Sequence, residues 1–224
     1  RTGLSSDIIY TLLEDRSTGD NAGALWIGTS GGGVSRWKDG HCTAYTTAEG
    51  LSGDFVSSLM EDRTGAESGA GGGAIWVGTL GGGVSCLKDG KFTSLTTKNG
   101  LSHNLVFTLL QDRTGDVWIG TNGGGVNRLH NGVLTAYTTQ NGLSHNLVRA
   151  LLEDRDGAIW IGTFGGGLNR FKDGKFTAFT TKDGLSHNLV WSLREDQLGT
   201  LWVGTFGGGL NRLRDGVFST FSTK

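Results

Sequence analysis

The chain is built from five copies of one unit of about 42 residues. The tripeptide Gly-Leu-Ser opens every copy, at Gly3, Gly50, Gly100, Gly142 and Gly184. A short unit repeated at a fixed period cannot bury its apolar surface alone, so neighbouring units stack and share a core. The first two copies are longer because they carry extra residues at 17–24 and 64–74. The repeat therefore restricts the fold to architectures in which similar units pack in series.

Within each copy the pattern predicts four short strands. Glycine contributes 41 of the 224 residues and proline none, and glycine inside a helix costs roughly 0.5–1 kcal/mol relative to alanine, so the chain cannot be mostly helical. In the fourth copy, apolar and alternating segments predict strands over Leu147–Glu153, Ala158–Thr163, Gly167–Lys172 and Lys175–Thr181. An Asp-Gly or Asn-Gly pair separates the last two strands of every copy, which predicts a type I′ hairpin at 39–40, 89–90, 131–132, 173–174 and 215–216.

Four strands in about 42 residues are typical of a propeller blade. We therefore expect an all-β fold: a five-bladed β-propeller with four antiparallel strands per blade, forming one domain over residues 1–224. The expected blades are 1–49, 50–99, 100–141, 142–183 and 184–224. The tryptophan in each copy is the expected core residue between blades, at Trp26, Trp76, Trp118, Trp160 and Trp202. A β-solenoid is the alternative, but solenoid coils are shorter and lack a regular hairpin. We expect a monomeric ring closed by the first blade packing against the fifth.

Charge and composition exclude several function classes. The formal net charge is −1, which provides no electrostatic footprint for nucleic acid or for an acidic membrane surface. No run of 18 apolar residues is present, so we expect no membrane insertion. The two cysteines, Cys42 and Cys86, occupy different positions of the repeat, and we expect no disulfide between them. We expect no cofactor.

The copies resemble the two-component regulator propeller repeat of bacterial sensor proteins. In the fourth copy the resemblance rests on Gly142-Leu143-Ser144, Asn146, Val148, Glu153-Asp154, Gly157, 159–163 (Ile-Trp-Ile-Gly-Thr) and 165–170 (Gly-Gly-Gly-Leu-Asn-Arg). The resemblance implies a periplasmic sensor region that recognises carbohydrates or other extracellular cues. The chain departs from that pattern because it has only five copies and no kinase or membrane segment. A fragment, a short stand-alone relative and an engineered repeat protein all remain open.

Two positions vary between copies while their neighbours stay constant, and both are expected on the face that carries the triple-glycine links and the links between blades. The first position holds Tyr10, Ser57, Phe107, Arg149 and Trp191, and the second holds Ser30, Leu80, Asn122, Phe164 and Phe206. Such a mixture of aromatic and polar side chains suits a pocket for a polar ligand with an apolar face. The alternative is that these residues only pack around a narrow central opening. The candidate ligand-binding residues are Tyr10, Phe107, Arg149, Trp191, Asn122, Phe164 and Phe206.

Three histidines precede an asparagine on the same face, at His103, His145 and His187, and we include them as candidate ligand-binding residues. A shared metal would need their ring nitrogens to converge to about 2 Å from one point, which equivalent positions on adjacent blades do not allow, so no metal site is expected. The alternative is that the following Asn caps the loop and the His faces solvent.

Acid–base and nucleotide chemistry are disfavoured. The recurring Glu-Asp pairs cannot form a facing dyad, because neighbours on a strand point to opposite faces, and the Asp suits a turn before Gly. The triple glycines are not followed by Lys-Ser/Thr and a helix, so the phosphate-binding loop is excluded. The sequence thus predicts a non-enzymatic recognition module for a small carbohydrate or peptide, or else a repeat protein without a ligand.

Overall fold

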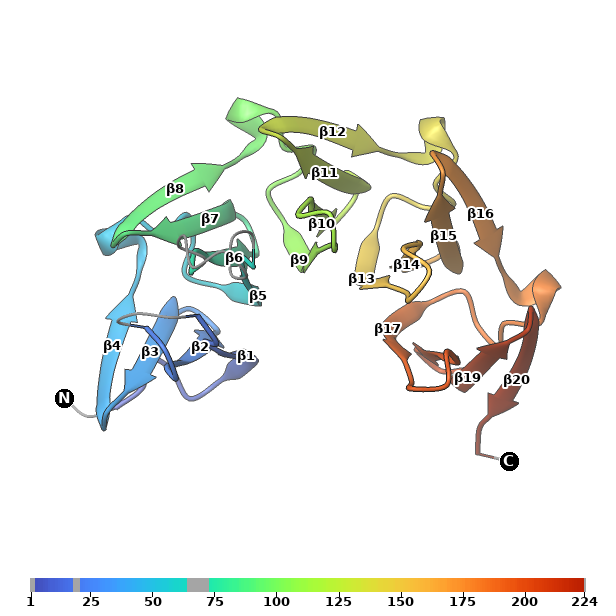
Figure 1. Cartoon of the computed structure of the whole chain (residues 1–224), viewed down its shortest axis with the longest axis horizontal. Helices are drawn as coiled ribbons and strands as arrows, with labels where there is room; N and C mark the ends of the chain where they lie inside the picture. Colours follow the sequence, from blue (N-terminus) through green and yellow to red (C-terminus); the bar gives the residue numbers. More distant parts are fainter. Residues whose placement is uncertain (1–2, 18–20, 64–72, 224) are drawn as a thin grey trace. The chain divides into compact units, whose positions relative to one another are not determined.

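The computed structural model describes residues 3–17, 21–63 and 73–223, and within them the chain forms five four-stranded sheets. The strands of each sheet follow one another in sequence order (Figure 1). The chain is a five-bladed β-propeller, as the repeat predicts, with one sheet per copy. It divides into two compact units, residues 1–117 and 118–224, which are described separately below.

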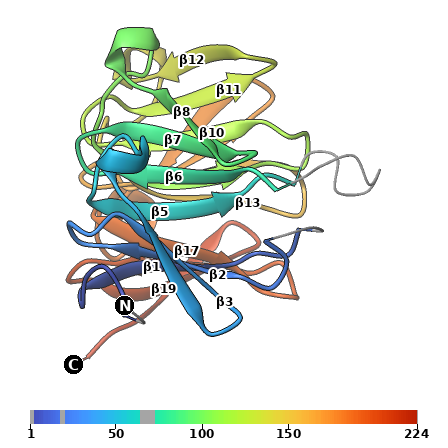
Figure 2. The same cartoon turned by 90° about the vertical axis from the view of Figure 1, so that its left-hand side faces the viewer.

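The strand bounds follow the repeat closely. Blade 1 contains β1 (Ile9–Glu14), β2 (Leu25–Thr29), β3 (Val34–Lys38) and β4 (His41–Tyr45). Blade 2 contains β5 (Val56–Glu61), β6 (Ile75–Thr79), β7 (Gly83–Lys88) and β8 (Lys91–Leu95), of which β5, β6 and β7 lie side by side in Figure 2. Blade 3 contains β9 (Val106–Gln111), β10 (Val117–Thr121), β11 (Val126–His130) and β12 (Val133–Tyr137). Blade 4 contains β13 (Val148–Glu153), β14 (Ile159–Thr163), β15 (Leu168–Lys172) and β16 (Lys175–Phe179). Blade 5 contains β17 (Val190–Glu195), β18 (Leu201–Thr205), β19 (Gly209–Arg214) and β20 (Val217–Phe221).

The hairpin between the last two strands of each blade is the predicted one. Asp173 has φ 51° and Gly174 has φ 76°, and the equivalent pairs in the other four blades also have two positive φ angles. A type I′ turn requires this conformation, which Asp, Asn and Gly tolerate best. The local sequence therefore sets the register of the outer strands.

The fourth strand ends earlier than predicted. In blade 4 it stops at Phe179 rather than Thr181, and a 3-10 turn, η5 (Thr181–Asp183), follows. Thr180 caps this turn, accepting from the Lys182 N–H, while Asp183 accepts from the Thr180 N–H at 2.8 Å. The same turn recurs as η1 (Thr47–Glu49), η3 (Thr97–Asn99) and η4 (Thr139–Asn141). The Thr-x-x-Asp/Asn/Glu-Gly signal of a capping box was present in the sequence and predicts this turn.

Of the five tryptophans expected in the core between blades, Trp26, Trp118 and Trp160 are buried, whereas Trp76 and Trp202 are half-buried. In the first unit, Trp26 and Val34 of blade 1 pack with Leu51, Val56 and Val77 of blade 2. In the second unit, Trp160 and Leu168 of blade 4 pack in the same way with residues of blade 5, namely Leu185, Val190, Leu201, Val203 and Leu213. Each of these two interfaces thus joins the tryptophan face of one blade to the first-strand face of the next.

The glycine after each Trp-Ile or Trp-Val pair reflects this close packing. A Cβ built on Gly162 would lie 2.6 Å from Val190 Cγ1 of blade 5 and 3.2 Å from Ala150 Cβ. Contacts this short are not tolerated, so only glycine lets β14 approach blade 5.

Part of each predicted insertion lies outside the described residues. This holds for residues 18–20 of copy 1 and 64–72 of copy 2, so their position on the hairpin face stays a prediction.

Among the residues that are described, no helix has the length and apolar character needed to cross a membrane. Cys42 on β4 and Cys86 on β7 are free thiols.

Candidate ligand-binding surface

The first variable position is a β-bulge. In blades 1, 2, 4 and 5 the register between the first two strands shifts across a single residue. In blade 4, Val148 pairs with Thr163 and Ala150 with Gly162, which leaves Arg149 unopposed. The corresponding residues are Tyr10, Ser57 and Trp191. A bulged residue takes no part in the regular pairing, so its side chain can change without altering the ladder.

The second variable position directly follows the second strand of each blade. It forms an isolated bridge with the next blade, as in Ser30↔Phe55, Leu80↔Leu105, Asn122↔Leu147 and Phe164↔Leu189. The backbone is held by these bridges while the side chains vary. At both variable positions the backbone is therefore fixed while the type of side chain differs from blade to blade.

In the second unit these positions form one cluster across blades 4 and 5. The ring centroids of Phe164, Trp191 and Phe206 lie 5.9–6.2 Å apart in all three pairs. The Arg149 guanidinium carbon lies 4.9 Å from the Trp191 ring centroid and 5.7 Å from that of Phe164. Four predicted ligand-binding residues thus meet, and we call Arg149, Phe164, Trp191 and Phe206 the aromatic–arginine cluster.

The cluster combines exposed apolar surface with a positive charge. Trp191 is 49% exposed and Phe206 is 60% exposed, whereas Arg149 and Phe164 are half-buried. Partial burial lowers the pKa of the Arg149 guanidinium, because desolvation disfavours the charged form. Guanidinium groups nonetheless stay protonated at neutral pH, and their planes stack on aromatic faces.

The remaining variable residues lie elsewhere. Tyr10 is exposed and Phe107 is half-buried, and both belong to the first unit. Asn122 is half-buried on blade 3. Ser57, in contrast, donates its hydroxyl to the backbone carbonyls of Gly78 (3.0 Å) and Val106 (2.7 Å), so its role is structural.

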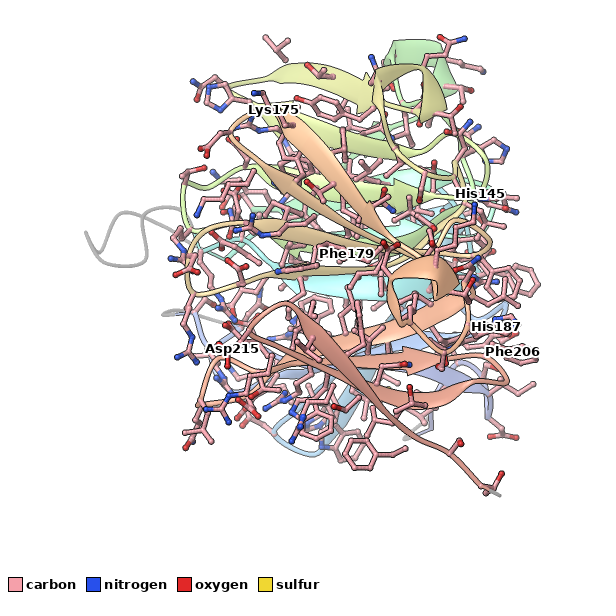
Figure 3. All side chains as sticks on the ribbon, turned by 90° about the vertical axis from the view of Figure 1, so that its right-hand side faces the viewer. His145, Lys175, Phe179, His187, Phe206 and Asp215 are labelled. Carbon is pink, nitrogen blue, oxygen red and sulfur yellow. The ribbon has the colours of Figure 1, made fainter. Side chains whose placement is uncertain are left out.

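Each of the three histidines accepts a hydrogen bond within its own loop. Nδ1 of His103, His145 and His187 accepts the N–H two residues later, at 3.0–3.1 Å. All three are half-buried, and a role for them in ligand binding stays a prediction. The following Asn caps the preceding turn as expected, since Asn188 Oδ1 accepts from the Thr181 N–H at 3.0 Å. Figure 3 shows His145, His187 and Phe206 on the side opposite the hairpin residues Lys175 and Asp215, which confirms the predicted division of faces in this unit.

Neighbouring protein atoms occupy the space beside the triple-glycine link. A Cβ on Gly166 would lie 2.7 Å from the Ser144 backbone carbon and 2.8 Å from His145 Cβ. Gly165 and Gly167 donate their N–H groups to the Asn188 carbonyl of the next blade, at 3.1 and 3.0 Å. Neighbouring loops, and not open space for a ligand, therefore explain these glycines.

The Asp of the Glu-Asp pair has a second role that the sequence did not reveal. As predicted, Asp154 Oδ1 accepts turn N–H groups, from Asp156 at 3.0 Å and Ala158 at 2.8 Å. Its other oxygen, Oδ2, accepts the indole N–H of the core Trp160 at 2.7 Å. The same indole bond occurs at Asp15–Trp26 and Asp196–Trp202, each 2.9 Å. These carboxylates are structural.

The Glu of the Glu-Asp pair forms hydrogen bonds with the preceding blade. Glu195 accepts from the Arg155 backbone N–H and pairs with its guanidinium, each at 3.0 Å. In the first unit Gln111 accepts from the Arg63 N–H at 2.7 Å, so Gln replaces Glu without loss of this bond. Among the described residues no three His, Cys, Asp or Glu side chains are grouped to hold a metal ion.

Comparison with known proteins supports the architecture. Residues 100–123, 142–165 and 184–207 match the family model of the two component regulator propeller. The extracellular domain of a putative hybrid two component system from B. thetaiotaomicron is 28% identical, with a TM-score of 0.80 over 99% of this chain and 29% of that chain. The extracellular domain of a second such system from the same organism is 20% identical, with a TM-score of 0.76 over 97% of this chain and 31% of that one. Virginiamycin B lyase from Staphylococcus aureus is 18% identical, with a TM-score of 0.68 over 99% and 72%, and shares the fold. A comparison with curated protein sequences gives no match.

The fold and the repeats together define the class: a β-propeller related to the sensor domains of two-component systems. More particularly, copies 3, 4 and 5 each contain a segment that matches the two-component regulator propeller model, which confirms the resemblance drawn from the Trp-Ile-Gly-Thr and triple-glycine blocks. The chain spans less than a third of the two sensor domains that it resembles.

Proposed function

We propose that this chain is a non-enzymatic recognition module that binds a small carbohydrate at the aromatic–arginine cluster. The observation that carries the proposal is the convergence of four variable residues, from two blades, on one exposed surface. Variable residues on a constant backbone are what a family of related recognition modules needs to change its ligand without changing its fold.

The chemistry of the cluster suits a sugar. Trp191 and Phe206 present flat apolar faces that can stack on the C–H face of a pyranose ring. Arg149 is held beside Trp191 at 4.9 Å and carries a planar fork of N–H donors, the type of group that recognises hydroxyl and carboxylate oxygens. A peptide is the second ligand class that this combination fits.

The location of the relatives also supports the proposal. The sensor domains that the chain resembles are described as extracellular, so we place this module outside the cytoplasm. A recognition domain in that location meets nutrients and polysaccharide fragments before they enter the cell.

A glycan array of neutral and uronic-acid oligosaccharides tests the proposal directly, followed by titration of each hit by isothermal calorimetry. We expect Trp191→Phe to retain binding and Trp191→Ala or Arg149→Ala to weaken it by about tenfold or more, the loss typical of a central contact residue. The same calorimetric titration applies to all three variants, so their affinities can be compared directly.

Leu198→Ala is the matched control, since Leu198 is exposed in the first turn of blade 5 and outside the cluster. Its affinity should equal that of the unaltered chain. The proposal is wrong if no glycan binds, or if binding survives both alanine substitutions. In the first case a repeat protein without a sugar ligand is the better description.

A further inference from the structure

The chain contains four Asn-Gly dipeptides, at 99–100, 122–123, 131–132 and 141–142. In an Asn-Gly pair the backbone nitrogen of the glycine can attack the side-chain amide of the preceding asparagine, because glycine has no side chain to obstruct the approach. The dipeptide is the same in all four places. The hydrogen bonds around each pair are different, and they leave only one of the four pairs arranged for this reaction.

Two of the pairs belong to capped 3-10 turns, which hold the asparagine amide away from the glycine. Asn141 Oδ1 accepts from the Thr138 N–H at 2.9 Å and from the Thr138 hydroxyl at 3.2 Å. Asn99 Oδ1 accepts from the Thr96 N–H, and its Nδ2 donates to the Ser94 carbonyl at 2.8 Å. Both amides are therefore directed back along the chain, and attack by the following glycine would first have to break these bonds.

In a third pair, Asn122–Gly123, the attacking nitrogen is engaged. The Gly123 N–H donates to the Asn146 carbonyl of the next blade at 3.1 Å. Asn122 itself forms an isolated bridge with Leu147. The backbone of this pair is thus fixed between two blades, and its nitrogen is not available for attack.

The fourth pair, Asn131–Gly132, lies at the tip of the blade 3 hairpin. The ladder between β11 and β12 ends at His130↔Val133, so the peptide between Asn131 and Gly132 lies beyond the last pair. Their φ angles are 48° and 79°, both residues are exposed, and a Cβ built on Gly132 meets nothing within 4 Å. No backbone acceptor for the Gly132 N–H is found in the described part of the chain. The groups that react here all belong to one hairpin of the second unit.

A histidine lies beside the nitrogen that must leave. His130 Nε2 is 3.2 Å from Asn131 Nδ2. An amide nitrogen leaves more easily when it gains a proton, and an imidazole within hydrogen-bond reach can deliver one. At the two equivalent positions the other blades carry a Lys or Arg followed by Asp, at 38–39, 88–89, 172–173 and 214–215. Blade 3 thus differs from the other four blades at both residues.

We propose that Asn131 is a self-modification site, at which the chain converts its own asparagine into aspartate and isoaspartate. The Gly132 nitrogen bonds to Asn131 Cγ and the Cγ–Nδ2 bond breaks. His130 gives a proton to Nδ2, which leaves as ammonia, and regains a proton from the Gly132 N–H through solvent. The product is a cyclic succinimide. Water then opens the ring at one of its two carbonyls and restores a carboxylate, so water is the only co-reactant.

The two products have different effects on the hairpin. Opening at the side-chain carbonyl gives aspartate on a normal backbone, the residue that blade 4 carries as Asp173 with φ 51°. This product therefore keeps the turn and adds one negative charge. Opening at the main-chain carbonyl gives isoaspartate, in which the backbone is longer by one methylene. A two-residue type I′ turn does not accommodate the extra atom, so the pairing of β12 with β11 should loosen as the molecule ages.

Incubation of the folded chain at neutral pH, followed by peptide mass spectrometry, tests the proposal. The mass separates acid from amide, and fragmentation separates aspartate from isoaspartate. We expect Asn131 to react at least about tenfold faster than Asn99, Asn122 and Asn141. In guanidinium chloride all four should react at similar rates, because the selectivity comes from the fold. Equal rates at the four sites of the folded chain, or the same preference for Asn131 after unfolding, overturn the proposal.

Two variants test the part played by His130. His130→Arg introduces the residue that blade 5 carries as Arg214, which keeps a positive charge but cannot release a proton. It should slow the reaction at Asn131 by about threefold or more, less than the roughly 10²–10⁴-fold typical of enclosed acid–base groups, because this ring is exposed. Gln140→Arg is the matched control, since it adds the same charge before Asn141, and the rate at Asn131 should not change. An unchanged rate in a natively folded His130→Arg variant overturns the role of His130.

Discussion

Asp154 and its equivalents show how one side chain can hold a turn and a core at the same time. One carboxylate oxygen of Asp154 accepts two turn N–H groups while the other accepts the indole N–H of Trp160. The sequence indicated the turn, because Asp before Gly is a local signal. It could not indicate the indole bond, since that bond depends on how the tryptophan ring sits after the blades have packed.

Replacing this carboxylate should be costly. Asp154→Ala leaves the Trp160 indole N–H and two turn N–H groups without their acceptor, and the cost of such a loss is about 1–3 kcal/mol per buried group. The free energy of unfolding, from urea titration, should fall by about 2–4 kcal/mol. Asp156→Ala alters the exposed neighbour in the same turn and should change stability by less than about 0.5 kcal/mol. Equal losses in the two variants would contradict the assignment.

The equivalent residue in blade 5 predicts a pH dependence. The hydrogen bond from the Trp202 indole, followed by that from the Thr200 N–H, lowers the pKa of Asp196. Because the folded-state pKa lies below the unfolded value, Asp196 contributes stability above the unfolded pKa of about 3.9, and this contribution is lost as the pH falls through the folded pKa.

The urea midpoint measured between pH 2 and pH 6 tests this dependence. Asp196→Asn should be less stable than the unaltered chain at pH 6, and the difference should shrink as the pH falls below about 4. A difference that stays constant over the whole range would show that ionisation of Asp196 is not involved.

At the scale of the strand and the turn, local sequence patterns predicted most of the strands and hairpins. The hairpins followed from Asp-Gly, and the strands from alternation and glycine spacing, to within one or two residues at each end. The bulge at Arg149 and Trp191 was not predictable in this way, because a bulge is a property of the pairing between two strands and leaves no mark in either strand alone. In the sequence, only the variability of this position distinguished the bulged residue from its neighbours.

The hairpin backbone predicts a clear difference between two substitutions. Asp173 has φ 51°, a conformation that Asn also adopts readily, and Asn131 occupies the same place in blade 3. Asp173→Asn should therefore leave the urea midpoint almost unchanged. Asp173→Val should lower the free energy of unfolding by about 1–2 kcal/mol, because a β-branched side chain is strained at positive φ. If both variants were equally stable, the turn would not be setting the register.

At the scale of the whole molecule, the sequence predicted the number of blades and the residues between them, because both follow from counting repeats. The candidate surface was only partly predictable. Variability identified Arg149, Phe164, Trp191 and Phe206, but which members of a variable set meet depends on the packing of blade 4 against blade 5. The use of histidine Nδ1 within its own loop was not predictable, because the sequence showed only that the three histidines recur before an asparagine.

The bulge in the first strand also has a consequence for how such a protein can diversify. Residues 10, 149 and 191 lie outside the regular pairing, so a library randomised at these three positions should retain the fold in most members, whereas Ser57 is held by its own hydrogen bonds. Copying a blade by gene duplication then supplies a new, independently variable position at no cost to the neighbouring strands. Selection for a new ligand could act on these positions one blade at a time while the scaffold stays the same.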